Sequence, residues 1–410
     1  MLKITNNFLF LKNKKNNINK VKIIIKDIKK YGENALKFYI LKIDGIKIKN
    51  IKNIIIKNKQ MKYSFYKISF YKKKILKEIY IRLKRYHYHN FLNSWQIKKN
   101  NIIYGQKFCK IENICIYVPG GQTIYPSSIF MNCIPSLIYK SKITMITPIK
   151  NNLISNLLIS ISYLNNINKI ILSGGVHTLS CFVYGTKNIK KVNKITGPGN
   201  LYITKAKKIF YGNIGIDMVA GPSELIIICD EYIHIDIIIY DFFSQLEHDK
   251  KTSCYLLCNN KKYLNILFNK IFLLLINQKN KKIILISINN SFLIFKNIFF
   301  SIELINFFSP EHLMICIKKP NKILKFIKNS GAIFINYYSS EVYGDYCVGP
   351  SHVIPTGKTS KFFSSLNIND FYKKISIIKI LNNNYLKKIS SFFSKIEKFF
   401  SHSYSSIIRK

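Results

Sequence analysis

The chain has 410 residues, of which 48% are apolar, so it is a globular protein long enough for a substantial buried core and for two or more domains. It contains 65 Lys and Arg against 19 Asp and Glu, a formal net charge of +46. This balance is typical of nucleic-acid-binding proteins. However, the lysines are spread along the whole chain, and Lys, Ile, Asn, Phe and Tyr dominate throughout, so we interpret the charge as compositional bias and expect no nucleic-acid partner.

The first part of the chain is predicted to be helical and without chemistry of its own. Residues 1–20 form a basic Asn/Lys tract whose apolar patch is shorter than the ~7–15 residues of a secretory signal core, so we expect a frayed terminus. The alternative is an organellar transit peptide, because no acidic residue precedes Asp27. Apolar residues at helical spacing then predict helices over 21–44 and 75–95.

Residues 114–210 alternate short β-branched runs with helix-compatible segments. The predicted strands are 114–118, 143–147, 169–172 and 194–196, and the predicted helices are 127–139, 153–164, 178–184 and 201–210. Such alternation is typical of a doubly wound parallel sheet. Ten of the 17 glycines lie between Gly120 and Gly221, and Gly-rich turns at the carboxyl ends of parallel strands hold phosphate groups well. The Gly-x-Gly-x-x-Gly fingerprint is absent, so a nucleotide site here would be atypical.

A second alternation of strands and helices follows Gly221. The predicted strands are 225–229, 255–257, 283–286, 313–317 and 332–336, and the predicted helices begin at 235 and cover 262–276 and 321–329. Residues 344–356 are predicted to form a loop, and the chain is predicted to be helical from Asp370 to its end, with a break at 382–384. The sequence therefore predicts an α/β fold of two Rossmann-like doubly wound domains with parallel sheets, a helical N-terminal segment and a helical C-terminal tail.

A candidate metal site lies at the end of the predicted helix that begins at 235. Gln245 and His248 are three residues apart, so they share one helix face and could bind one ion. The alternative is an ordinary solvated helix face. Three other stretches with His or acidic residues could complete the site: 309–312, 344–346, and Glu397 with His402.

The cysteines and the hydropathy pattern indicate a cytoplasmic protein. The nine cysteines are odd in number and form no Cys-x-x-Cys motif, so we interpret them as reduced, buried thiols without a disulfide framework. No uninterrupted apolar run approaches the ~20 residues of a membrane helix, and we expect no membrane partner.

Several short motifs, in a fixed order, resemble those of the histidinol dehydrogenase family. Tyr-Val-Pro-Gly-Gly, Gly-Pro-Gly-Asn and Ala-Gly-Pro-Ser-Glu are three of them. The matching stretches are 117–121, 125–128, 185–186, 197–200, 215–218, 220–224, 244–249, 310–313, 344–346, 352–356 and the pair Glu397 and His402. Each motif alone is a weak signal, whereas the ordered set is very specific and runs from about residue 21 to the C-terminus.

The resemblance implies that the chain oxidises L-histidinol through bound L-histidinal to L-histidine with two NAD⁺, the last step of histidine biosynthesis. It also implies one Zn²⁺ per subunit and a homodimer. The implied zinc ligands are Gln245, His248, Asp345 and His402, and the implied acid–base pair is Glu311 and His312. The implied substrate contacts are Ser223, Gln245, His248, His312, Asp345, Glu397 and His402, with Glu397 and His402 supplied in trans, and the implied NAD contacts are Tyr117, His177 and Asn200.

Two positions depart from the family pattern: His177 stands where the family has Gln, and Ser351 where it has Asn. The first concerns the NAD site, and neither changes an implied zinc ligand. His352 is either part of the site or a structural loop histidine. The division of the chain that we expect is residues 1–116 with 223–366 as a discontinuous α/β domain carrying most of the metal and substrate site. Residues 117–222 then form the NAD-binding domain, and 367–410 form a helical tail on the partner subunit.

Three other functions are considered. The first is a related zinc- and NAD-dependent dehydrogenase of another amino or hydroxy alcohol, against which Glu397 and His402 argue because they match the imidazole-orienting site. The second is a basic nucleic-acid-binding protein, whose affinity would fall steeply with salt. The third is an inactive relative, against which the full set of site residues argues.

Overall fold

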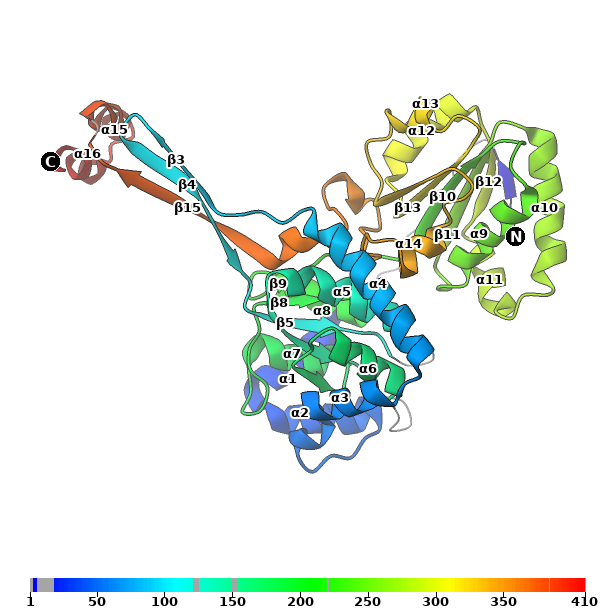
Figure 1. Ribbon diagram of the computed structural model, residues 1–410, viewed down its shortest axis with the longest axis horizontal. Coiled ribbons are helices and arrows are strands. Elements are labelled where there is room, and N and C mark those ends of the chain that lie inside the picture. Colours follow the sequence, from blue (N-terminus) through cyan, green and yellow to red (C-terminus); the bar gives the residue numbers. More distant parts are fainter. Residues whose placement is uncertain are drawn as a thin grey trace.

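The structure is a computed structural model that describes residues 3–5, 18–120, 125–148, 154–219, 221–382 and 384–409. Predictions that concern residues 1–2 and 6–17 of the basic tract, Gly121, Leu153, Ala220 and Asn383 therefore lie outside the described part. Two six-stranded sheets form two domains, and a three-stranded antiparallel sheet forms an arm that leaves them (Figure 1). The two parallel sheets confirm the predicted α/β class.

The first domain is built on a sheet of strand order β2-β7-β6-β5-β8-β9, in which only β2 is antiparallel to its neighbour. Its strands are β2 (Ile55–Lys57), β5 (Asn113–Tyr117), β6 (Lys142–Ile146), β7 (Lys169–Ile171), β8 (Lys194–Thr196) and β9 (Gly215–Ile216). The crossover helices are α5 (Pro126–Ile138), α6 (Asn156–Leu164), α7 (Gly175–Tyr184) and α8 (Leu201–Phe210). These elements agree with the predicted βα alternation. The strands were recognisable in the sequence because a strand that is buried on both faces is a continuous β-branched run.

The N-terminal helices also cover this first sheet. They are α1 (Ile18–Tyr31), α2 (Glu33–Tyr39), α3 (Asn58–Lys67) and α4 (Phe70–Tyr88), with short helical turns η1 (Ile40–Asp44) and η2 (Ile51–Ile54). Val21 and Leu36 join the core of α7 and α8 on one face, while Met61 and Leu83 join the core of α5 and α6 on the other. The core that contains Met61 and Leu83 also includes Val353 and Leu366 from the stretch 223–366.

The second domain has a fully parallel sheet of order β1-β12-β11-β10-β13-β14. Its strands are β1 (Lys3–Thr5), β10 (Glu224–Cys229), β11 (Ser253–Cys258), β12 (Phe292–Phe295), β13 (His312–Cys316) and β14 (Ala332–Ile335). Its helices are α9 (Ile235–Leu246), α10 (Lys261–Leu275), α11 (Lys281–Ile288), α12 (Ile298–Phe308), α13 (Asn321–Leu324) and α14 (Glu341–Tyr346). The expected frayed terminus is wrong for residues 3–5, which pair with β12 at the sheet edge.

Three local predictions in this domain are corrected. Residues 283–286 are not a strand but part of α11, where Ile284 and Ile288, one turn apart, face the core. Residues 344–346 end a helix, α14, that Ser340 caps by accepting a hydrogen bond from the Val342 amide. The helix predicted over 321–329 is only the short α13, and the strand β12 was not predicted.

The arm corrects the prediction of a wholly helical tail. Strands β3 (Trp95–Lys99), β4 (Ile102–Lys110) and β15 (Tyr372–Ile380) pair in the order β15-β4-β3, so the helix expected over 75–95 ends at Tyr88. A short turn, η3 (Thr359–Lys361), and a second, η4 (Ile368–Phe371), precede β15, and α15 (Asn384–Ile396) with α16 (Phe400–Ile407) forms the tip. Figure 1 shows this tip far from both domains. Local spacing could not reveal the strand, because its partner β4 lies more than 260 residues earlier.

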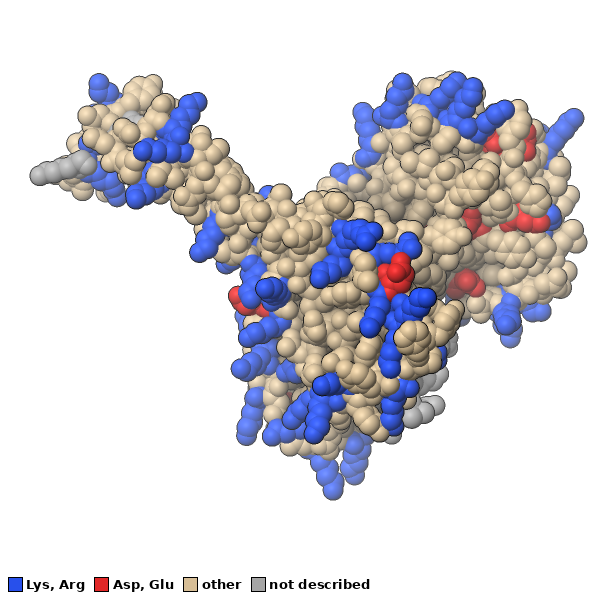
Figure 2. Space-filling model, in the orientation of Figure 1, with Lys and Arg blue, Asp and Glu red and all other residues tan. Residues whose placement is uncertain are grey.

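Lys and Arg side chains are spread over both domains and the arm tip on the face shown in Figure 2. Acidic side chains are few on that face, as the composition predicts. Among the described helices, none combines the length and the apolar character needed to cross a membrane.

Candidate active site

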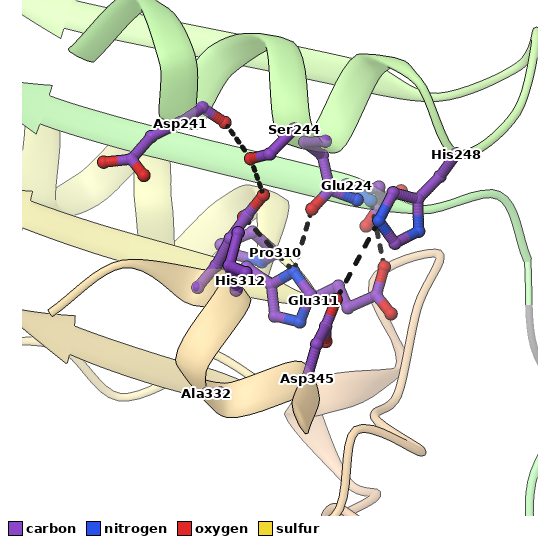
Figure 3. A network of polar contacts seen from close by, with 12 residues as sticks. Glu224, Asp241, Ser244, His248, Pro310, Glu311, His312, Ala332 and Asp345 are labelled. Carbon is purple, nitrogen blue, oxygen red and sulfur yellow. Dashed lines mark hydrogen bonds and ion pairs between the residues drawn. The ribbon is translucent and has the colours of Figure 1, made fainter. Parts of the chain in front are cut away.

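The predicted catalytic residues meet at the amino ends of two neighbouring strands of the second sheet. Ser223 directly precedes β10, and Glu311 and His312 stand at the start of β13, whose His312 is in register with Leu225 of β10. The end of α9 brings Gln245 and His248 to the same place. Asp345 reaches it from α14, and Figure 3 shows its carboxylate directed towards His248. The structure thus collects residues from four separate stretches of sequence.

His312 is buried, with 3% of its surface exposed. Its Nδ1 lies 3.1 Å from the side-chain amide of Gln245 and 3.6 Å from a carboxylate oxygen of Glu341. Its Nε2 has no hydrogen-bond partner in the described part of the chain. Burial, together with the neighbouring His248 and His352, lowers the pKa of His312 to about 3. The imidazole is therefore neutral and has one unpartnered nitrogen.

Glu341 is a buried carboxyl that sequence reasoning missed. It accepts a hydrogen bond from the Ser244 hydroxyl at 2.8 Å. Gln245 lies between Glu341 and His312, and in the orientation in which its amide oxygen accepts the Nδ1 proton of His312 at 3.1 Å, Nε2 is left as the acceptor nitrogen. Burial raises the pKa of Glu341 well above its usual range, and nearby acidic residues, among them Asp345, raise it further. No local motif marks this residue, whose role depends on α14 packing against α9.

Glu311 is buried beside His312 and accepts a hydrogen bond from the backbone N–H of Glu224 at 3.1 Å. Burial raises the pKa of Glu311 well above its usual range, and the nearby Asp345 and Glu224 also raise it. A carboxyl with a raised pKa is a stronger base once it is ionised, which suits it to remove a proton from water.

Three of the four implied zinc ligands lie together, and the fourth does not. His248 Nε2 is 3.8 Å from Asp345 Oδ2, and the buried Gln245 lies one helical turn before His248. Burial raises the pKa of Asp345, an effect that His248 opposes. Within the residues that the structure describes, no three His, Cys, Asp or Glu side chains are grouped to hold a metal ion. The implied set has only two such residues in this cluster, so its nitrogen and oxygen donors suit Zn²⁺ but need completion from elsewhere.

Glu397, just after α15, and His402, in α16, are exposed at the tip of the arm. Figure 1 shows these helices well away from α9 and α14 of the same chain. The structure therefore does not bring Glu397 or His402 to the other site residues within one chain.

The three implied NAD contacts lie at the carboxyl edge of the first sheet. Tyr117 ends β5 and is buried, and burial raises its pKa to about 12. His177 is buried in α7, with Nε2 3.3 Å from both Asp44 Oδ2 and Ser173 Oγ. Only Asn200 is exposed, and its side chain caps α8 by accepting hydrogen bonds from the backbone. The structure brings the three to one edge of the sheet but leaves one of them open to solvent.

A cavity of about 130 Å³ joins the two domains at this place. Gly197, Pro198 and Gly199 line it from the first domain, and Ser223 and Glu311 line it from the second. The Gly-rich turn and the Glu311 carboxyl therefore face one shared space, the arrangement that a ligand bridging the two domains needs.

His352 also lines this cavity, and both of its ring nitrogens have protein partners. Its Nδ1 is 3.0 Å from the carbonyl oxygen of Asp345, and its Nε2 is 3.4 Å from Ser128 Oγ of the first domain. Ser351, the second departure from the family pattern, donates to the carbonyl oxygen of Met131 at 3.2 Å. These contacts give the 351–352 loop a structural role in joining the domains.

Comparison with known proteins identifies the family. The family model described as histidinol dehydrogenase matches residues 11–410. The histidinol dehydrogenase of Methanococcus maripaludis is 34% identical over 388 residues, 93% of this chain and 90% of that protein. That of Pseudomonas savastanoi pv. phaseolicola is 33% identical over 359 residues, 87% of this chain and 80% of that protein.

Solved structures agree with this result. The crystal structure of histidinol dehydrogenase from Elizabethkingia anophelis has a TM-score of 0.91 and 26% identity, covering 97% of this chain and 93% of that one. An aldehyde dehydrogenase from Bacillus cereus has a TM-score of 0.52 at 11% identity, covering 89% of each chain, which shows a related fold alone. The family model, the relatives and the crystal structure lead to one conclusion: this chain belongs to the histidinol dehydrogenase family.

Proposed function

We propose that this chain oxidises L-histidinol to L-histidine, through bound L-histidinal, with two NAD⁺ and one Zn²⁺ per subunit. The observation that carries the proposal is the cavity between the domains, where Glu311 and Ser223 face the Gly-rich turn at 197–199. His312, Gln245, His248 and Asp345 lie around the same strand ends.

Gln245, His248 and Asp345 would hold zinc together with His402 of the partner subunit. Their donor atoms are the nitrogen and oxygen types that Zn²⁺ prefers. When bound, the metal supplies a Lewis acid that orients the imidazole and amine of histidinol. Ser223 of the same chain and Glu397 of the partner subunit would contact the rest of the substrate.

His312 is the proposed base for the first hydride transfer, from the alcohol. In the alcohol step it accepts the hydroxyl proton at Nε2, the nitrogen without a partner, while the hydride moves from the carbinol carbon to NAD⁺. Glu341 lies on the Nδ1 side and is placed to stabilise the imidazolium that results. Burial of His312 keeps its imidazole neutral before substrate binds, so that the ring can accept a proton.

Glu311 is the proposed base for the second step. It takes a proton from the water that adds to the aldehyde, and the hydrate then transfers its hydride to a second NAD⁺. The pKa of Glu311, raised by burial, favours this proton transfer. NAD⁺ would bind along the 197–200 turn, with Asn200, Tyr117 and His177 at the same sheet edge.

The exposed apolar face of the tip supports a homodimer. Phe392, Ile396 and Phe400 are 61%, 62% and 76% exposed, which is unusual for side chains of their size. In the homodimer that we propose, a second copy of the chain covers these side chains, and its tail lies near the zinc site of the first copy. We propose a cytoplasmic location, which the nine cysteines, all free thiols, support.

The test is to purify the protein, add L-histidinol and NAD⁺, and follow NADH. Two NADH formed for each histidinol consumed, with L-histidine as product, supports the proposal. One NADH per substrate, or turnover of other amino alcohols but not histidinol, would contradict it. Tight binding of DNA or RNA that weakens steeply with salt, without turnover, would favour a nucleic-acid function.

A further inference from the structure

A buried ion pair lies directly beneath the 197–200 turn. Lys207 of α8 and Asp217, just after β9, approach to 2.7 Å, and their side chains are 5% and 1% exposed. Charged side chains are rarely buried this deeply, because the loss of hydration must be offset by a partner and by further hydrogen bonds.

The further hydrogen bonds of this pair go to a single residue, Gly197. The Lys207 ammonium donates to the Gly197 carbonyl oxygen at 2.5 Å, and Asp217 Oδ2 accepts from the Gly197 N–H at 2.8 Å. Gly197 has φ of +111°, and a Cβ built there would lie 2.0 Å from the carbonyl oxygen of Tyr117. The backbone therefore adopts a conformation that only glycine allows, and the ion pair holds that conformation from both sides.

The rest of the turn is held by its helix. Asn200 accepts hydrogen bonds from the backbone N–H groups of Tyr202 and Ile203 at 3.0 and 3.2 Å, which fixes the start of α8. The turn is thus fixed at Gly197 by the ion pair and at Asn200 by the cap. Between them, Pro198 and Gly199 line the cavity that also contains Glu311.

A purely structural role does not require charge at these positions. Well-packed apolar side chains of similar size stabilise a buried site as well as, or better than, an ion pair. The charges of this pair instead satisfy the two backbone groups of a residue at the cavity wall. We propose that Lys207 and Asp217 are positioning residues that set the 197–200 turn in the conformation that binds the pyridine dinucleotide; this rests on the proposed function.

The test compares Lys207→Met/Asp217→Asn with Lys194→Met as a matched control. The double variant leaves no unpaired charge. Lys194 is a second buried lysine of the first domain, with an ion pair to Asp370 at 3.3 Å, and it does not line the cavity. Affinity for NAD⁺ is measured by calorimetry on the zinc-loaded dimer, and KM is measured separately for NAD⁺ and for histidinol.

We expect the double variant to bind NAD⁺ about tenfold more weakly, the effect of losing roughly one charged hydrogen bond in positioning the turn. Its KM for histidinol should stay within about twofold of wild type. Lys194→Met should lose thermal stability without a change in NAD⁺ affinity. Wild-type NAD⁺ affinity in the double variant would overturn the inference, whereas a wild-type enzyme that does not bind NAD⁺ would overturn the proposed function itself.

Amide hydrogen exchange of the wild-type enzyme is a second test of the inference, and it does not require the double variant to fold. The peptide that contains Gly197 should exchange slowly without NAD⁺, because the ion pair already holds its N–H. Fast exchange that slows only after NAD⁺ is added would show that the pair does not preset the turn, and would overturn the inference.

Discussion

The length of the arm predicts that each active site takes His402 from the other subunit. β15 has nine residues and spans roughly 30 Å at about 3.4 Å per residue. All nine pair with β4, so the arm holds α16 away from its own domains (Figure 1). A zinc–nitrogen bond is only ~2.0–2.1 Å long. His402 can reach the site of its own chain only if the arm separates, whereas a two-fold related copy can supply it with the arm intact.

Mixed dimers test this arrangement quantitatively. The Asp345→Asn chain is defective in the body of the subunit, and the His402→Asn chain is defective in its tail. The two chains carry different affinity tags, so the mixed dimer is purified by two successive affinity steps. If the tail acts in trans, one site of each mixed dimer combines an intact body with an intact tail, and the other carries both lesions. NADH formation should then recover to about half of wild type per dimer, a ratio set by two-fold symmetry.

Two differently tagged Asp345→Asn chains serve as the control and should recover nothing. If the Asp345→Asn and His402→Asn mixture also recovers nothing, every site keeps one lesion. The tail would then act within its own chain, and the reasoning from arm length would be refuted.

Four further predictions follow from the site. Chelation should abolish activity and Zn²⁺ should restore it, and full activity in protein shown to be metal-free by elemental analysis would remove the metal from the mechanism. His312→Asn should lower kcat by on the order of 10²–10⁴; a smaller loss in steady-state assays would exclude it as the base. Glu311→Gln should slow histidinal oxidation more than histidinol oxidation, and equal slowing of both would show that it does not act on water. Burial raises the pKa of Glu224 to about 7, above its unfolded value near 4.3, so this carboxyl costs stability increasingly as pH rises through that interval. Glu224→Gln should thus stabilise the protein by on the order of 1–3 kcal/mol at pH 8 and far less at pH 5 in urea unfolding, and an equal effect at both pH values would contradict the shift.

Local pattern was sufficient for most of the two parallel sheets. The short β-branched runs at β5, β6, β8 and β10 stand out because strands buried on both faces are continuously apolar. The same pattern misled at 283–286, which belongs to α11 and of which only Ile284 is buried. Apolar runs that are short do not distinguish a strand from a buried helix.

The sequence by itself determined the alternation of strands and helices in the first domain and the identity of the family, because both follow the chain locally. It also placed Gln245 and His248 on one helix end, since that relation depends only on helical spacing. The tertiary structure alone decided that Glu341 lies against His312, that Lys207 and Asp217 hold Gly197, and that β15 pairs with β4 to carry the tail away. Each of these contacts joins residues on different elements, and which elements meet is set by packing across the whole molecule and not by neighbours in the sequence.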